Sequence, residues 1–147
     1  MSLREHLNES MKTAMKARDD LRLSAIRMIR SMVKNREIDQ KKEMDDQGII
    51  EVISTLSKQR RESIRMYQEG NRPDLVEKEE AELAILLGFL PAQLSEEEIN
   101  ALIDRVIAET GAQGAKDMGR VMKALTPLTS GKADGKAVSE AVKRKLA

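Results

Sequence analysis

Any chemistry in this sequence would have to come from hydroxyl, carboxylate and basic side chains. Cysteine is absent and His6 is the single histidine, so thiolate nucleophiles, disulfides and zinc sites are excluded. Ser31 and Lys34 have the serine–lysine spacing of penicillin-recognising enzymes, but the companion motifs of those enzymes do not follow. We therefore expect no catalytic residue, no metal site, no cofactor and no intrinsic enzymatic activity.

Basic residues in the last quarter of the chain are the clearest candidates for binding. Residues 111–147 carry eight basic and three acidic residues, a net charge of +5, whereas the whole chain has only +1. Gathered positive charge can meet a phosphate backbone and release its counterions. The expected RNA-binding residues are Lys116, Arg120, Lys123, Lys132 and Lys136. The alternative interpretation is a solvated polar face.

A glycine-bearing turn at residues 131–136 precedes the last expected helix. Backbone N–H groups at such a helix start can bind an anion, and flanking lysines would strengthen the binding. The turn is not a P-loop, because it lacks one spacer residue and has Ala137 where Ser or Thr is needed. The alternative is a turn capped by Asp134 that happens to be basic.

Two further basic stripes lie on earlier helices, each within an arc of about 60°. Their members are Arg27, Arg30 and Lys34, then Lys58, Arg61 and Arg65. Such stripes can contact phosphates, but more often they are solvated faces that pair with nearby carboxylates.

One charged group points inward instead. An advance of about 100° per residue from Ile49 puts Arg60 within the apolar stripe of its helix. The same exercise from Leu75 puts Glu79 and Glu82 in the apolar face of the next helix. In an antiparallel hairpin the arginine lies opposite these carboxylates, so we expect a partly buried Arg60–Glu79/Glu82 ion pair that fixes the helix register. The alternative interpretation is a charged functional site in a groove.

Hydrophobic periodicity predicts seven helices and no strand, which makes the fold class all-α. We expect a four-helix N-terminal part with a long antiparallel helical hairpin over residues 1–91. A small three-helix C-terminal domain follows over residues 92–147. Residues 39–48 are expected to form a polar connector, and the sixth helix is expected to end before Pro127.

Composition narrows the class of partner. The two aromatic residues, Tyr67 and Phe89, are expected in the core, so base stacking on single strands is disfavoured and folded RNA remains open. No apolar run approaches the ~20 residues that a transmembrane helix needs. The charged start of the chain does not read as a signal or transit peptide, which with the absence of cysteine favours the cytoplasm.

Several short motifs occur in a characteristic order along essentially the whole chain. They are Ile26-Arg27-Met28, Lys58-Gln59-Arg60, Arg72-Pro73-Asp74-Leu75, Glu79 with Glu82 before Leu90-Pro91, Leu94-Ser95-Glu96-Glu97-Glu98, Asp117-Met118-Gly119 with Val121-Met122, and Gly131-Lys132-Ala133-Asp134-Gly135. In this order they resemble the YqeY proteins of bacteria. One departure is Phe89, where that family commonly has tyrosine, which puts a local hydrogen bond in doubt.

The C-terminal part of the YqeY family is similar to the tail of the GatB subunit of the tRNA-dependent amidotransferase. The resemblance implies that residues 92–147 touch the body of a tRNA. GatB chemistry lies in another domain and the glutaminase in a separate subunit, and nothing in this chain matches either. Carbon–nitrogen ligase activity with glutamine as amide donor is therefore implied only by association.

Together these points predict a non-catalytic accessory protein that binds tRNA or another structured RNA, alone or with a tRNA-modifying partner. One alternative is a component of an amidotransferase complex that does not hold the active site. Another is a protein–protein adaptor that binds no RNA.

Overall fold

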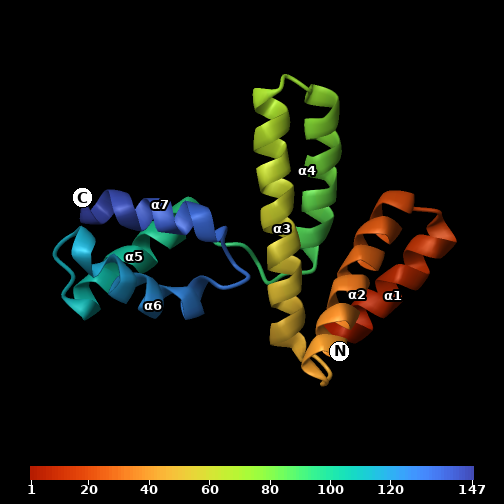
Figure 1. The fold of residues 1–147 in the computed structure, drawn as a ribbon, viewed down its shortest axis with the longest axis horizontal. Helices are drawn as coiled ribbons and strands as arrows, with labels where there is room; N and C mark the ends of the chain where they lie inside the picture. Colours follow the sequence, from red (N-terminus) through yellow and green to blue (C-terminus); the bar gives the residue numbers. More distant parts are fainter. The chain divides into compact units, whose positions relative to one another are not determined.

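The computed structural model describes all of residues 1–147, and its regular secondary structure is entirely helical, which confirms the all-α class. Its contacts divide the chain into two compact units, which we call the N-terminal unit (Met1–Pro91) and the C-terminal unit (Ala92–Ala147) (Figure 1). The elements are α1 (Leu3–Ala17), α2 (Asp20–Gln40), α3 (Asp46–Glu69), α4 (Pro73–Gly88), α5 (Glu96–Thr110), a 3-10 turn η1 (Ala115–Asp117), α6 (Met118–Thr129) and α7 (Gly135–Leu146).

Polar side chains fix where most of the helices begin. Ser2 and Ser95 each accept a hydrogen bond from the backbone N–H three residues later, and a glutamate at that later position accepts in return, so both form capping boxes. Single aspartates, Asp19, Asp45 and Asp134, cap α2, α3 and α7. The start of α4 has no side-chain cap and instead has Pro73 in its first turn.

Two expected boundaries are wrong. The connector between α2 and α3 is only residues 41–45, because Asp45 accepts from the N–H of Gly48 at 2.9 Å and so starts the helix before that glycine. Helix α6 continues past Pro127 to Thr129. Pro127 lies near the end of α6, where it removes only the helical bond to the carbonyl of Lys123, and both residues are exposed.

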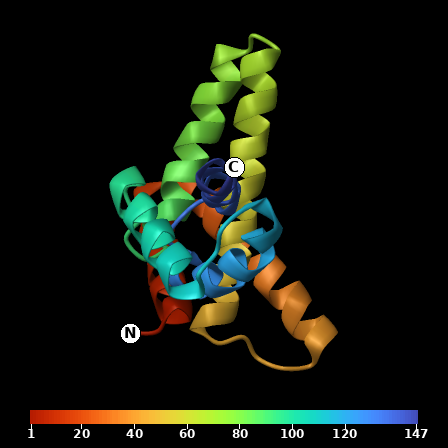
Figure 2. The ribbon, with the colours of Figure 1, turned by 90° about the vertical axis from the view of Figure 1, so that its left-hand side faces the viewer.

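The apolar core of the N-terminal unit uses all four of its helices. Its fully buried members include Ile26 and Ile29 of α2 and Ile49, Val52 and Ile53 of α3. The buried residues of α3 lie in the half of the α3–α4 hairpin nearest to α1 and α2. The other half, which ends at the turn before Pro73, extends beyond α1 and α2 (Figures 1 and 2).

The two aromatic residues lie in different environments, one inside this core and one outside it. Phe89 is buried in it and meets the ring of His6 edge-on, with centroids 5.2 Å apart. Tyr67 lies outside the core, on a surface hollow near the end of the hairpin, so the expectation that it is a core residue is wrong. The reason is that α1 and α2 do not reach its level, and α4 alone covers that part of α3.

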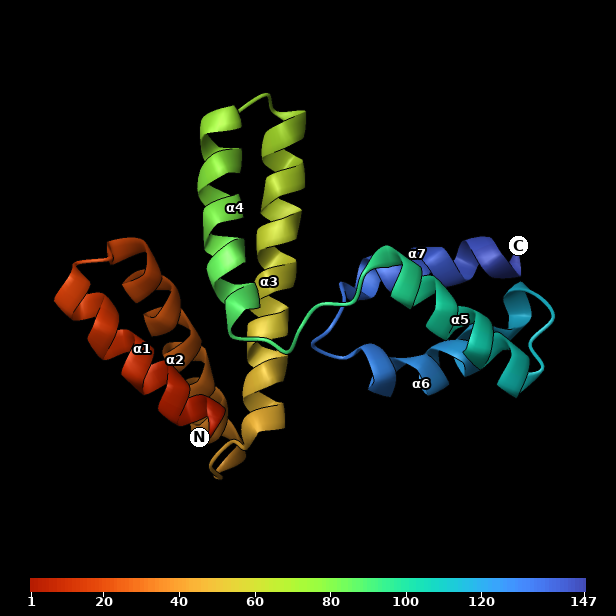
Figure 3. The same cartoon turned by 180° about the vertical axis from the view of Figure 1, so that it is seen from behind.

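The C-terminal unit has a separate apolar core among α5, α6 and α7 (Figure 3). Its fully buried members are Ile103, Val106, Val121, Leu125, Val138 and Val142. The turn between α6 and α7 is held to the start of this unit, because Leu94 N–H donates to the carbonyl of Lys132 at 2.8 Å. No helix in either unit is long and apolar enough to cross a membrane.

Candidate nucleic-acid interface

Lys116, Arg120 and Lys123 lie along the outward side of η1 and α6. The inward side of α6 is set by Val121 and Leu125, which are fully buried in the C-terminal core. A helix repeats every 3.6 residues, so Arg120 and Lys123 fall on the opposite side of α6. Lys116 lies in η1, directly before this helix. All three side chains are exposed. The apolar stripe of α6 therefore turns these cations toward solvent.

One carboxylate partly neutralises this stripe. Asp117 Oδ1 lies 3.2 Å from Arg120 Nη2, and Asp117 also accepts a hydrogen bond from the backbone N–H of Gln113 at 2.9 Å. The Gln113 hydrogen bond is the main reason that the pKa of Asp117 lies below its usual value, with the charges of Arg120 and Lys116 adding to it and desolvation opposing it. Lys123 has no ion pair.

Lys132 and Lys136 flank the turn before α7, and both are exposed without an ion pair. The backbone there is not free to hold an anion. The N–H groups of Lys132 and Ala133 both donate to the carbonyl of Thr129, and Asp134 accepts from the N–H of Lys136 at 3.3 Å. The aspartate occupies the position an anion would take at this helix start, so only the lysine side chains could contact a phosphate.

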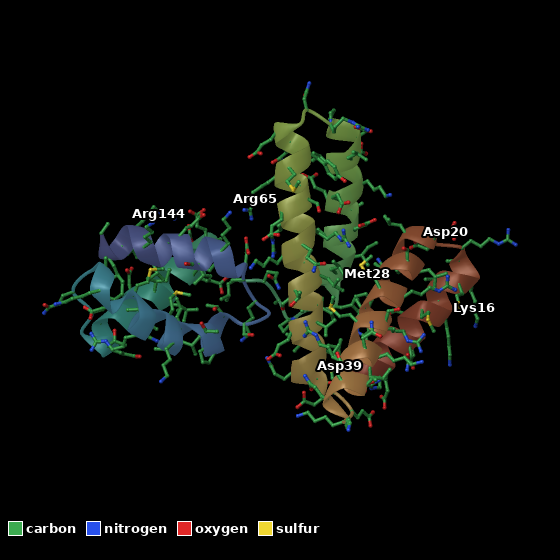
Figure 4. All side chains as sticks on the ribbon, viewed as in Figure 1. Lys16, Asp20, Met28, Asp39, Arg65 and Arg144 are labelled. Carbon is green, nitrogen blue, oxygen red and sulfur yellow. The ribbon has the colours of Figure 1, made fainter.

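The five candidates do not share one helix face. Helices α6 and α7 pack against the same core, so their outward sides point in different directions (Figure 3). Sequence reasoning left Lys143 and Arg144 out of the site, although both are exposed on α7 (Arg144 is labelled in Figure 4). The signal that could have found Lys143 is its spacing of seven residues from Lys136, which puts both on one side of the helix.

The three helices of this unit carry charge unequally. Helix α5 contains five acidic residues and one basic residue, while α6 and α7 together contain six basic residues and one acidic residue. Lys145 of α7 and Asp104 of α5 join the two sides through a 2.7 Å ion pair. The C-terminal unit is thus electrically polarised, with its positive charge away from α5.

Arg60 lies inside the α3–α4 contact of the N-terminal unit. Its Nη1 atom is 3.2 Å from Glu79 Oε2 and its Nε atom is 3.4 Å from Glu82 Oε2. The three side chains are only 17%, 13% and 19% exposed, respectively. Arg60 Nη2 also lies 3.1 Å from the sulfur of Met28, on the side of α2 that faces the hairpin (Figure 4). We call these four residues the Arg60 cluster.

The chemistry of the Arg60 cluster is that of a structural contact. Its arginine already has two carboxylate partners, so no charge remains to attract an anionic ligand. Elsewhere, no three histidine or acidic side chains come together in a way that could hold a metal ion.

Comparison with known proteins identifies the family. A family model described as Yqey-like protein matches residues 4–146. The chain belongs to the YqeY family. Among curated proteins, the chain is 43% identical over 108 residues to the mitochondrial protein "Altered inheritance of mitochondria protein 41" of Lachancea thermotolerans, covering 71% of this chain and 57% of that protein.

Other YqeY-family relatives carry the same name. The Kluyveromyces lactis protein is 38% identical over 106 residues, which is 70% of this chain and 57% of the relative. The Saccharomyces cerevisiae protein is 36% identical over 85 residues, which is 57% of this chain and 46% of the relative. The chain therefore spans about half the length of the curated relatives it matches.

These relatives overturn two expectations from the sequence. Their names place them in mitochondria, and their sources are yeasts, which contradicts a cytoplasmic location and an exclusively bacterial family. The physical reason for the error is that a charged N-terminus and an absence of cysteine are compatible with a stable helical domain in more than one compartment. These two features therefore do not distinguish the cytoplasm from mitochondria.

Proposed function

We propose that this YqeY-family protein is a non-catalytic accessory protein that binds structured RNA, with tRNA the first candidate, through its C-terminal unit. The contact surface comprises Lys116, Arg120, Lys123, Lys132 and Lys136. One observation carries the proposal: all five side chains are exposed, and only Arg120 spends its charge in an ion pair. Unpaired cations are available to displace counterions from a phosphate backbone.

The type of RNA follows from which side chains the surface lacks. No aromatic side chain occurs in the C-terminal unit, so it has no platform on which unpaired bases could stack. Lysine side chains reach phosphates whatever the base sequence. The surface is therefore suited to the backbone of a folded RNA, and the similarity of this part of the family to the GatB tail favours tRNA.

The polarised charge of the C-terminal unit also favours one orientation on the RNA. The acidic helix α5 is repelled by phosphates, whereas α6 and α7 are attracted. Binding would thus occur with α5 turned away from the RNA, although the net charge of the whole chain is only +1.

The test is a titration of bulk tRNA against the full chain at about 50 mM and 200 mM salt. In the test variant, Lys123→Gln, Lys132→Gln and Lys136→Gln remove three unpaired cations. We expect at least about tenfold weaker binding at low salt and a salt slope reduced by about 2–3, since each lost phosphate contact removes roughly 0.9.

A matched control removes three exposed lysines of the N-terminal unit, through Lys12→Gln, Lys16→Gln and Lys78→Gln. Net charge changes equally in both variants, so only a local surface predicts a difference between them. Equal binding by the test variant and the wild type would refute this surface. A wild-type protein that does not bind tRNA even at low salt would refute the proposed function and favour a protein–protein adaptor.

A further inference from the structure

A second concentration of positive charge lies in the N-terminal unit, beside an open hollow of about 580 Å³. Helices α1 and α2 and the first turn of α3 line the hollow. Its charged lining consists of four basic residues, Arg4, Arg27, Arg30 and Lys34, and one acidic residue, Glu37. Neither the proposed function nor the Arg60 cluster uses these residues.

Contacts within the unit already satisfy two of these five charges. Arg4 forms an ion pair with Glu37 and donates to the carbonyl of Met44 at 3.2 Å. Glu37 also accepts from the N–H of Met44 at 2.8 Å, and this hydrogen bond chiefly lowers the pKa of the carboxyl. The only carboxylate of the hollow is thus held by an arginine and a backbone donor, and its charge does not offset the remaining cations.

The remaining cations, Arg27, Arg30 and Lys34, form one row along α2. Their spacing of three and four residues puts them on one side of the helix, over a rise of about 10 Å. All three are exposed and none has an ion pair. The Nη1 atom of Arg30 lies 2.9 Å from the sulfur of Met11. This contact is weak, because a thioether sulfur is a poor hydrogen-bond acceptor.

Neutral hydrogen-bonding groups lie among these cations. Asn8 of α1 and Ser31 of α2 line the same hollow. Neither side chain has a hydrogen-bond partner within the protein. An amide, a hydroxyl and three cations around one concave surface form a set of donors suited to an oxyanion. We call Asn8, Arg27, Arg30, Ser31 and Lys34 the α2 groove.

We propose that the α2 groove is a second RNA-binding site, which contacts backbone phosphates. It shares with the proposed function the premise that RNA is the partner, but it lies in the other unit and uses other residues. The two guanidinium groups match phosphate oxygens in a bidentate manner, and Lys34 adds a point charge farther along α2. Asn8 and Ser31 donate to oxygens that the cations leave free.

The open shape of the α2 groove favours a polymer over a small anion. Exposed charges gain little from one small ion in water, because solvent and salt screen each contact. A polyanion with closely spaced charges instead releases condensed counterions when several phosphates are neutralised together. A nucleic-acid duplex carries about one charge per 1.7 Å of its axis, counted over both strands. Most acidic peptides alternate carboxylates with neutral residues, so a folded RNA brings more charges to the groove at once, which favours RNA over a carboxylate-bearing partner.

The test compares tRNA binding by full-length variants of each unit. Neutralising the groove with Arg27→Gln, Arg30→Gln and Lys34→Gln should weaken binding at about 50 mM salt at least fivefold and lower the salt slope by about 2–3. The Lys12→Gln, Lys16→Gln and Lys78→Gln control should stay within about twofold of wild type. Groove and control variants with equal affinities would overturn the inference.

The tRNA-binding test can contradict either of the two proposed sites without contradicting the other. Loss of binding only in the Lys123→Gln, Lys132→Gln and Lys136→Gln variant would overturn the α2 groove and keep the proposed function. Loss only in the groove variant would support the groove and overturn the C-terminal surface. No tRNA binding by the wild type would overturn both.

A variant that adds a carboxylate provides an independent check without removing any cation. Ser31→Asp places a negative charge inside the α2 groove, while Gln40→Glu adds the same charge at the exposed last residue of α2, outside the groove. Weaker tRNA binding by Ser31→Asp than by Gln40→Glu supports the inference, and equal binding contradicts it. Displacement of tRNA by polyglutamate at equal charge concentration would overturn the assignment to phosphate.

Discussion

Charge is placed in opposite ways in two regions of this protein, the α3–α4 contact and the outward side of α6. In the Arg60 cluster, a guanidinium lies between two helices with carboxylates at 3.2 and 3.4 Å, and little of it meets water. On α6, Lys123 has no ion pair and is exposed. The first arrangement specifies how two helices meet, whereas the second leaves charge for a partner. The direction of a basic residue relative to the apolar stripe of its helix therefore indicates its role.

Removing one cation from each arrangement should affect the stability of the protein very unequally. Arg60→Ala should lower the free energy of unfolding by about 2–4 kcal/mol, because it leaves two largely buried carboxylates without their partner. Lys123→Ala should change it by less than about 0.5 kcal/mol, as is usual for a solvated side chain. Chemical denaturation followed by circular dichroism measures both.

A third variant separates the charges from the packing. Arg60→Met with Glu79→Gln and Glu82→Gln removes every charge of the cluster but keeps most of its volume. Because a complete ion cluster seldom adds net stability, this triple variant should lose less than Arg60→Ala alone. Equal losses of unfolding free energy in Arg60→Ala and Lys123→Ala would contradict a structural role for the Arg60 cluster.

The two units also differ in how a helix begins. Helix α4 starts without a side-chain cap, at a turn that Arg72 and Asp74 join through a 3.0 Å ion pair. Helix α5 starts with the Ser95 and Glu98 capping box. Ser95→Ala should cost about 1 kcal/mol, since it leaves the N–H of residue 98 without its acceptor.

Ser130→Ala is a suitable control for the Ser95 variant, because Ser130 is exposed and its side chain has no hydrogen bond. It should stay within about 0.5 kcal/mol of wild type. A cost of Ser95→Ala no larger than that of the control would show that packing of α5, rather than its cap, determines where this helix begins.

Periodicity was sufficient to derive the helical class and the direction of individual side chains. Counting about 100° per residue gives an inward Arg60 and an outward row of Arg27, Arg30 and Lys34 from the sequence alone. The early start of α3 could not be derived in this way, because it depends on which side chain accepts the hydrogen bond of the Gly48 N–H. The continuation of α6 through Pro127 could not be derived either, because it depends on how exposed the end of that helix is.

The candidate sites were less accessible to sequence reasoning than the helices. Periodicity shows which side of α2 carries Arg27 but not which helix lies beside it. The hollow forms where Arg4, Leu7 and Asn8 of α1 lie next to that side. In the C-terminal unit, the backbone donors near Lys132 looked available for an anion, but the fold commits them to Thr129. Both outcomes depend on contacts between segments, which a local pattern does not contain.

The smallest expected effect concerns two carboxylates, one in each unit, that a backbone donor holds. The Met44 N–H chiefly lowers the pKa of Glu37 below its ordinary 4.5, and the Gln113 N–H chiefly lowers the pKa of Asp117 below its ordinary 3.8. Each group binds fewer protons in the folded than in the unfolded protein. Its stabilising contribution is therefore complete above the ordinary value and is lost as the pH falls through the lowered one.

Carboxyl NMR titration of the wild type, Arg4→Gln and Arg120→Gln tests whether backbone donors dominate in both units. We expect the pKa of Glu37 to stay below 4.5 in Arg4→Gln and that of Asp117 to stay below 3.8 in Arg120→Gln, because the backbone N–H bonds remain. A return to the ordinary value in either variant would mean that the arginine, and not the backbone, lowers the pKa there.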